Sequence, residues 1–207
     1  DARRRNVGLT AAGRREFAAY EQLSNARARA ILDRHPEPDA LLAAMDMVAA
    51  AFGRDRITVE ETDPTSDPAR YCLGEYYAEL ARRFAQGFEV ARSRDPEAAA
   101  LRRPRGVFLL AMSDGLPVGC VGLKGDGGPV AEVKRLWVAP ATRGLGLAHR
   151  LMAAVEDAAQ SLSITTLRLD SNSALNEATR LYRSTGWTEI DRFNDDPYPD
   201  IFFAKPL

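Results

Sequence analysis

The chain has 207 residues, 45% of them hydrophobic and 28% charged, which is enough for one domain of ordinary size plus an appendage. Its net charge of −1 excludes a general electrostatic attraction to nucleic acid or to anionic membranes. No apolar run approaches the length of a membrane span and no secretory signal opens the chain, so we expect a cytoplasmic protein without membrane partners. Cys72 and Cys120 lack the spacing of a metal site or a disulfide framework, and we expect two small buried hydrophobic residues.

Residues 1–53 are rich in alanine and arginine and are expected to form a small helical domain. Thr10 is suited to cap a first helix, which should end at the two prolines of His35-Pro36-Glu37-Pro38. Asp39 is then expected to cap a second helix that ends near Gly53. Because neither helix carries much apolar surface, the sequence predicts a helical hairpin that needs a further surface to pack on.

The opening Asp1-Ala-Arg-Arg-Arg-Asn-Val-Gly-Leu-Thr10-Ala-Ala-Gly13 resembles the last wing strand and following helix of the MarR family of winged-helix regulators. The resemblance covers about the first 50 residues, and the helix-turn-helix that would read DNA is missing. It implies a fragment of a longer regulator, in which the hairpin helps to form a homodimer. DNA contact is then expected only through the missing winged helix, with Arg3 to Arg5 as the best candidates in this chain.

Residues 57–207 alternate between strand-like and helix-like segments, and they form the second expected domain. Asp114-Gly115, between two apolar runs, predicts a hairpin turn. The pattern indicates an α/β (α+β) domain with a mixed central sheet. The expected strands are 57–60, 106–113, 117–124, 131–138, 165–170, 187–191 and 201–205, and the expected helices are 67–88, 143–161 and 174–184.

A glycine-rich turn follows the fourth of these strands. Arg143-Gly144-Leu145-Gly146 opens the expected helix 143–161, where unpaired backbone N–H groups meet the positive end of the helix dipole. Such a turn can hold a phosphate group. Leu147-Ala148 stand where a nucleotide-triphosphate loop needs Lys and Ser or Thr, and His149 stands where a dinucleotide fingerprint needs a third small residue.

The pattern Arg-x-x-Gly-x-Ala after a strand resembles the acetyl-CoA signature of the GNAT family of N-acetyltransferases. Glu132 lies eleven residues before Arg143, where relatives carry a glutamate, and the segment from Leu181-Tyr182 to Gly186-Trp187 is similar to the family's later helix. The resemblance covers about residues 57–207. It implies a GNAT fold, with a mixed, mostly antiparallel central sheet flanked by helices. It also implies acetyl-CoA as cosubstrate, with the diphosphate held by the backbone amides of the turn.

The resemblance also implies roles for single residues. Glu132 would be the general base, although an ion pair with Lys134 or Arg135 explains it too. The amide of Leu136 would stabilise the negatively charged oxygen of the intermediate. Tyr182 would be the general acid, although a buried core position is an equal reading, and no metal is expected. The cofactor-binding residues implied are Leu136, Trp137, Val138, Arg143, Gly144, Leu145, Gly146, Leu147, Ala148 and, replacing an asparagine of many relatives, Asn172.

The expected activity is the transfer of an acetyl group from acetyl-CoA to a primary amine by direct attack. Two alternatives stay open: a regulator whose second domain senses acetyl-CoA or an amine without turnover, and a dimerisation module with an empty fold. Residues 71–76 and 193–198 are expected to rim the acceptor side, and their aromatic and acidic side chains favour a cationic amine. Amino acids, polyamines, amine antibiotics and protein lysines all remain candidates.

Overall fold

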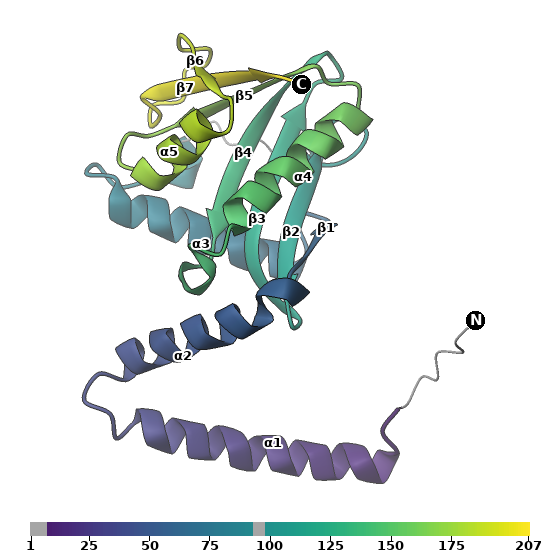
Figure 1. Cartoon of the computed structure of the whole chain (residues 1–207), viewed down its shortest axis with the longest axis vertical. Helices are drawn as coiled ribbons and strands as arrows, with labels where there is room; N and C mark the ends of the chain where they lie inside the picture. The colour runs from purple at the N-terminus through teal and green to yellow at the C-terminus, as the bar shows by residue number, and fades with distance from the viewer. Residues whose placement is uncertain (1–7, 93–97) are drawn as a thin grey trace. The chain divides into compact units, whose positions relative to one another are not determined.

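The computed structural model describes residues 8–92 and 98–207 of the chain (Figure 1). The chain divides into two units, residues 1–49 and residues 50–207. The division falls four residues before the predicted end of the first domain at Gly53, because the last turn of the second helix belongs to the second unit. The arginines at positions 3 to 5, and with them the predicted wing strand, lie outside the described residues.

The N-terminal unit contains two helices, α1 (Ala11–Leu32) and most of α2 (Pro38–Gly53). The predicted cap at Thr10 is confirmed, since its side-chain oxygen accepts a hydrogen bond from the N–H of Gly13 at 3.0 Å. The predicted cap at Asp39 is wrong. Helix α2 begins one residue earlier at Pro38, because a first helical position tolerates a residue without an N–H group, and Asp39 lies within the first turn.

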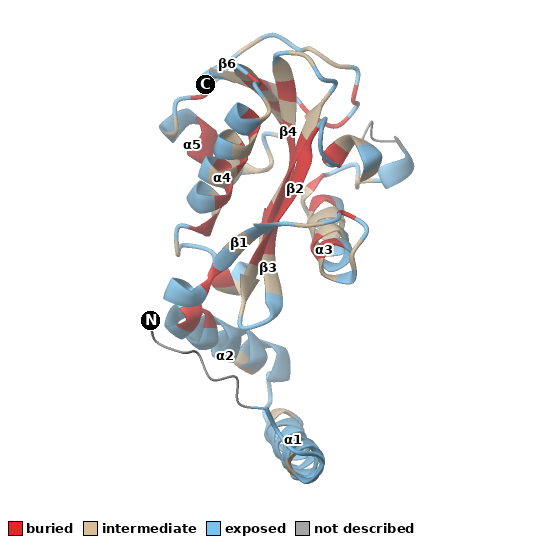
Figure 2. Ribbon diagram, turned by 90° about the vertical axis from the view of Figure 1, so that its right-hand side faces the viewer, coloured by how far each residue is buried: buried red, intermediate tan, exposed pale blue. Residues whose placement is uncertain are grey.

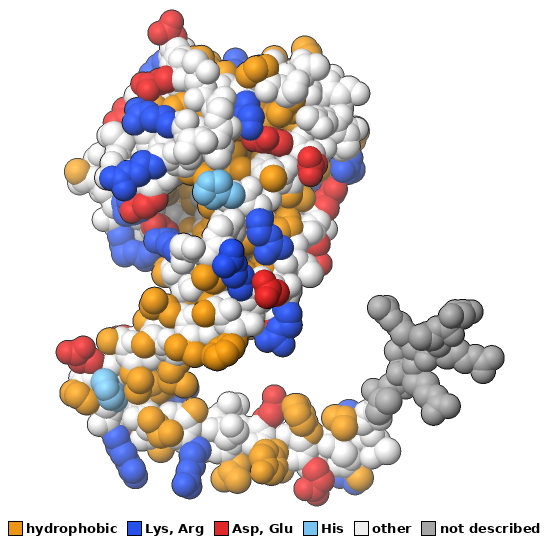
Figure 3. All heavy atoms as spheres, viewed as in Figure 1, with side chains coloured by type: hydrophobic (Ala, Val, Ile, Leu, Met, Phe, Trp, Pro, Cys, Tyr) orange, Lys and Arg blue, Asp and Glu red, His pale blue; other side chains and the backbone are white. Residues whose placement is uncertain are grey.

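The predicted helical hairpin, and the further surface that it needs to pack on, stay predictions for the described part of this unit. No residue of α1 is buried, and hydrophobic side chains remain exposed along both helices (Figure 3). The apolar stripes are too sparse for mutual burial to stabilise a packed pair. The MarR relationship and the homodimer stay predictions. The exposed apolar residues include Phe17, Tyr20, Leu23, Leu42, Met45 and Val48.

The second unit is built on one mixed sheet, which has seven strands in the described residues, in the order β1-β2-β3-β4-β5-β7-β6. All neighbouring pairs are antiparallel except β4 with β5, as the predicted mostly antiparallel sheet requires. The strands are β1 (Thr58–Glu61), β2 (Val107–Ser113), β3 (Leu116–Gly125), β4 (Val130–Val138), β5 (Thr166–Ser171), β6 (Thr188–Glu189) and β7 (Ile201–Pro206).

Helices cover both faces of this sheet (Figure 2). Helix α3 (Asp67–Arg83) packs on β3 and β4 from one side, while α4 (Leu147–Ser161) packs on β2, β3 and β4 from the other. Helix α5 (Asn176–Ser184) lies beside α4. The helix predicted at 143–161 begins at Leu147, four residues later than predicted, because Gly146 takes a left-handed conformation that ends the preceding turn.

The core follows from the apolar periodicity of α4. Leu147, Leu151, Met152, Val155 and Ala159 recur at helical spacing and are all buried against the sheet. A second cluster on the α3 side contains both cysteines as buried free thiols, as predicted. No described helix is long and apolar enough to cross a membrane.

The sheet opens between β4 and β5, and this opening positions the site. The two strands pair only from Val130 to Glu132 with residues 166–168, so the rest of β4 has no strand partner on that side. Between the β3–β4 pairs Cys120–Trp137 and Gly122–Lys134, β4 contains one residue more than β3. This is a β-bulge, and bulges re-aim the backbone and side chains of the strand that carries them.

Candidate active site

The glycine-rich turn forms a concave backbone surface at the start of α4. Gly144 and Gly146 have φ angles of 79° and 81°, a left-handed conformation that suits glycine, and no atom lies within 4 Å of a β-carbon placed on either. Gly146 is the N-cap, no side chain caps the helix, and no acidic residue stands in its first turn. The first amide groups of α4 are thus available to an anion at the positive end of the helix dipole.

Arg143 fastens this turn to the rest of the domain. Its Nε donates to the carbonyl oxygen of Val138 at 3.1 Å, and its terminal nitrogen donates to a carboxylate oxygen of Glu79 on α3 at 2.6 Å. Glu79 also accepts from the indole N–H of Trp137 at 3.2 Å and from Arg83 at 3.3 Å. In this structure the Arg143 side chain therefore links the turn to α3, and the Val138 carbonyl already has a donor.

A chamber of about 430 Å³ extends from this turn along the unpaired part of β4. Its walls bring together nearly all residues predicted to bind the cofactor, with Leu145 and Asn172 as the two that do not line it. The predicted residues that do line it are Leu136, Trp137, Val138, Arg143, Gly144, Gly146, Leu147 and Ala148.

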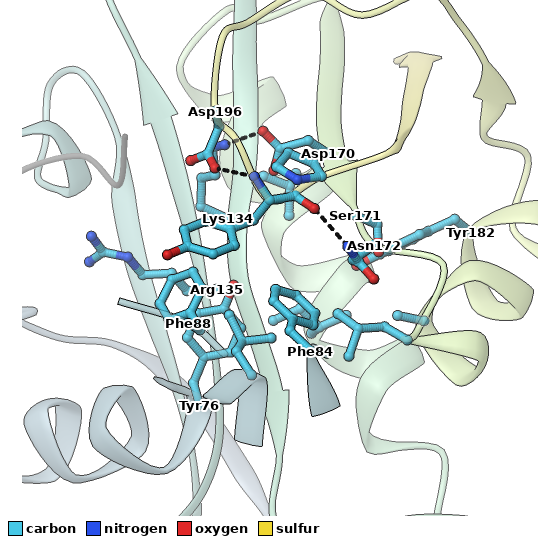
Figure 4. A pocket seen from close by; sticks show the side chains of 17 residues that line it. Tyr76, Phe84, Phe88, Lys134, Arg135, Asp170, Ser171, Asn172, Tyr182 and Asp196 are labelled. Atoms are coloured by element: carbon cyan, nitrogen blue, oxygen red, sulfur yellow. Dashed lines mark hydrogen bonds and ion pairs between the residues drawn. The ribbon is translucent and has the colours of Figure 1, made fainter. Parts of the chain in front are cut away.

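A second, smaller chamber of about 80 Å³ adjoins the first (Figure 4). Leu136, one of the two residues at the bulge, lines both chambers. Arg135, just before it, has a φ of 60°, which turns the strand at this point. The other residues that line both chambers are Tyr76, Leu80, Leu175 and Ala178.

Tyr182 lies on α5 and lines the smaller chamber. Burial, and secondarily the negative charge of Asp170, raises the pKa of its phenol well above the ordinary value. The hydroxyl group has no hydrogen-bond partner within residues 8–92 and 98–207. Tyr182 is thus packed in the core and also lines the smaller chamber, and its role as general acid stays a prediction.

Glu132 lies at the end of the paired part of β4 and lines neither chamber. Its carboxylate has three cationic neighbours, with Lys134 at 3.5 Å and both Lys124 and Arg168 at 3.9 Å. These contacts support the interpretation of Glu132 as an ion-pair residue. Its predicted role as general base stays a prediction.

Asn172 belongs to the smaller chamber rather than the larger one. Its amide nitrogen donates to the carbonyl oxygen of Tyr198 at 2.6 Å, and its side-chain oxygen accepts from the N–H of Ala174 at 2.9 Å. Both ends of the side chain are used to hold the loop before β7 and the turn before α5. Its contact with the pantetheine arm stays a prediction.

Sequence reasoning missed several residues of the site. Glu79 and Arg83 were unremarkable positions on a predicted helix, and their position at the larger chamber depends on how α3 packs. Asp170 was part of a predicted strand, and only its alternation with Arg168 signalled a shared face. Of the predicted acceptor rim, only Tyr76, Asp196 and Tyr198 line the smaller chamber.

The chain is similar to two curated relatives. The chain is 33% identical over 104 residues to an uncharacterized N-acetyltransferase from Schizosaccharomyces pombe, a match that covers 49% of this chain and 64% of that protein. It is 36% identical over 115 residues to an IAA acetyltransferase from Azospirillum brasilense, which covers 52% of this chain and 72% of that protein. The match thus spans just under two thirds of the first relative.

Two solved structures share the fold. An acetyltransferase of the GNAT family from Staphylococcus aureus superposes with a TM-score of 0.62 at 18% identity, covering 73% of this chain and 99% of that one. A putative acetyltransferase from Salmonella typhimurium, solved with its cofactor acetyl-CoA, has a TM-score of 0.54 at 20% identity, covering 73% and 94%. The family model of the acetyltransferase (GNAT) family matches residues 73–187, which is more than half of the chain and contains β4, the glycine-rich turn and Tyr182. This chain belongs to the acetyltransferase (GNAT) family.

Proposed function

We propose that the second unit transfers an acetyl group from acetyl-CoA to a primary amine by direct attack. The observation that carries this proposal is the arrangement of two adjoining chambers that meet at the bulged, unpaired edge of β4. One chamber begins at an anion-binding helix start, and the other has a phenol and two carboxylates in its walls. Together they offer a place for a phosphorylated acyl donor and a separate place for an acceptor.

The residues present fit coenzyme A. The open space at Gly144 and Gly146, together with the uncapped start of α4, suits a diphosphate. The free edge of β4 suits an extended arm that makes backbone hydrogen bonds, and at Val138 the Arg143 side chain would have to release the carbonyl oxygen first. When bound, acetyl-CoA supplies the activated acyl group.

The chain supplies the groups that handle charge. Leu136 lines both chambers, and its backbone amide is proposed to stabilise the negatively charged oxygen of the intermediate. The Tyr182 phenol is protonated at neutral pH and is proposed to protonate the departing thiolate. The Salmonella structure with acetyl-CoA and the names of the two curated relatives support acetyl-CoA as the acyl donor and acetyl transfer as the reaction.

A thiol-release assay with acetyl-CoA and a panel of amines tests the function, with acetyl-CoA-induced stabilisation measured in parallel. Turnover with at least one primary amine is expected. Stabilisation by acetyl-CoA without release of thiol for any amine would favour the sensing alternative. Absence of both would favour an empty fold, in which residues 1–52 carry the function of the chain.

A further inference from the structure

The smaller chamber has an aromatic wall. The ring centroids of Phe88 and Tyr198 are 4.6 Å apart, and Phe84 lies 6.0 Å from each of them. The Tyr198 hydroxyl accepts a hydrogen bond from the backbone N–H of Glu89 at 2.9 Å, which fastens the loop before β7 to the segment after α3. Ring faces packed in this way offer a rigid apolar surface to a flat ligand.

Asp170 on β5 contributes a carboxylate to the wall of this chamber (Figure 4). Its Oδ2 accepts from the ammonium of Lys134 and from the side-chain amide of Asn194, each at 2.6 Å. Its Oδ1 accepts no hydrogen bond from any residue that the structure describes. In contrast, Asp196 already uses Oδ1 to accept the backbone N–H of Tyr198 at 3.1 Å within its own loop.

Asp170 lies on β5 just beyond the point where β4 and β5 separate, whereas Glu132 lies on β4 in the last pair before that point. Glu132 pairs in register with Arg168, and Asp170 lies two residues further along the same face of β5. A strand rises about 3.3 Å per residue, so the two carboxylates occupy rows roughly 7 Å apart. On this face of β5, Asp170 is the first residue beyond the last β4–β5 pair, and it lines the chamber.

The charges around Asp170 limit what kind of acceptor can enter. Lys134 on β4, Tyr182 on α5, and Asn194 and Asp196 from the loop before β7 face it. Lys134 also lies 3.5 Å from Glu132, so its positive charge interacts with the carboxylates of both Glu132 and Asp170. Among the described lining residues two cations, Lys134 and Arg135, balance two carboxylates. A polyamine would add further positive charges beside the two cations.

We propose that this chamber, within the acetyl transfer proposed above, takes a small primary amine with a flat apolar body, and that Asp170 removes a proton from its ammonium group. The body lies against the wall formed by Phe84, Phe88 and Tyr198. The volume of about 80 Å³ is much smaller than the 430 Å³ of the larger chamber, which favours a small body over a large one. Such a substrate buries its apolar atoms and brings only one charge, which it loses on reaction.

The step balances in atoms and electrons. The ammonium gives one proton to the Asp170 carboxylate, and the nitrogen lone pair then bonds to the carbonyl carbon of the thioester. The carbon–sulfur bond breaks, and the sulfur keeps the electron pair. Tyr182 protonates the thiolate, and the second proton of the nitrogen restores the phenol. Asp170 returns its proton to solvent, so the products are an amide, a thiol and one released proton.

The substrate class is tested with four acceptors on the full chain: 2-phenylethylamine, L-phenylalanine, spermidine and a blocked lysine peptide. L-phenylalanine is the matched control, because it adds a carboxylate to the same body. We expect kcat/KM for 2-phenylethylamine to exceed each of the others by about tenfold or more. A Phe88→Ala variant should raise KM for it more than it lowers kcat. A best rate with spermidine, the amino acid or the peptide would overturn the proposed substrate class.

The role of Asp170 is tested with Asp170→Asn, Asp170→Glu and Asp200→Asn, each assayed for thiol release from pH 6 to 10. Asp200 is a control carboxylate that lines neither chamber and accepts the N–H of Ser173 at 2.7 Å. We expect Asp170→Asn to lower kcat/KM about a hundredfold or more, with a residual rate that rises with pH as free amine accumulates. Asp170→Glu should restore part of the rate, and Asp200→Asn should match the wild type.

Stabilisation by acetyl-CoA shows whether each variant is folded, because Asp170 does not line the larger chamber. Full turnover in Asp170→Asn, or loss of turnover in Glu132→Gln while Asp170→Asn stays active, would overturn the role of Asp170 and leave the proposed function standing. If the wild type releases no thiol with any amine although acetyl-CoA stabilises it, the proposed function itself fails.

Discussion

Replacement of Gly146 by alanine separates the conformational role of this residue from its role in binding. Its φ of 81° is left-handed, so a side chain costs about 1–2 kcal/mol of stability. For a unit of this size that corresponds to a decrease in Tm of about 2–8 °C. The methyl group meets no protein atom within 4 Å, so no steric clash adds to this cost in the free protein. The space it enters is the one proposed for the diphosphate.

The matched control is Gly115→Ala in the β2–β3 hairpin turn. Gly115 has a φ of 83° and equally open surroundings, but it lies outside both chambers. Both variants should therefore lose similar stability. Acetyl-CoA at a hundred times its Kd should stabilise the wild type and Gly115→Ala by about 2.7 kcal/mol, whereas a hundredfold weaker affinity leaves Gly146→Ala with about 0.4 kcal/mol.

Thermal unfolding with and without acetyl-CoA measures both effects in one experiment. Equal ligand-induced shifts in Gly146→Ala and Gly115→Ala would refute the proposed diphosphate site at the start of α4. Unequal losses of stability without ligand would show that the left-handed conformation alone does not set the cost.

Three further predictions concern Tyr182 and the core. Tyr182→Phe should lower kcat about tenfold to a hundredfold while KM for acetyl-CoA changes little, and an unchanged kcat would remove the phenol from proton transfer. Burial raises the pKa of Tyr182, so the native state favours the neutral phenol. The free energy of unfolding of the wild type, measured with urea, should therefore hold below about pH 10 and fall above it, where the phenol ionises in the unfolded chain. Tyr182→Phe should lack this part of the alkaline loss of stability. Leu151→Ala should lower the free energy of unfolding by about 2–5 kcal/mol, since Leu151 is fully buried on the face of α4 that packs on the sheet. A loss below about 1 kcal/mol would contradict the packing described.

The residues of the second unit were sufficient to predict its elements in order, because each carries its own local signal. The apolar stripe of α4 has helical spacing, Asp114-Gly115 permits a tight hairpin, and glycines at 144 and 146 permit left-handed backbone. The order and type of all ten predicted elements agree with the structure. Their ends shifted by up to five residues, since a helix end depends on capping and on the loops packed beside it.

The tertiary structure alone decided which side chains share a chamber. The distance in sequence from Arg143 led to the prediction of Glu132 as the base. Asp170, two residues beyond the pairing partner of Glu132 on β5, lies where β4 and β5 separate and lines the smaller chamber. The bulge at Arg135 and the packing of α3, which bring Leu136 and Glu79 to the cleft, depend on contacts between segments far apart in the chain. Local signals set the elements because they act over a few neighbouring residues. The site forms where β4 and β5 separate, and the position of that point depends on contacts between segments that are far apart in the sequence.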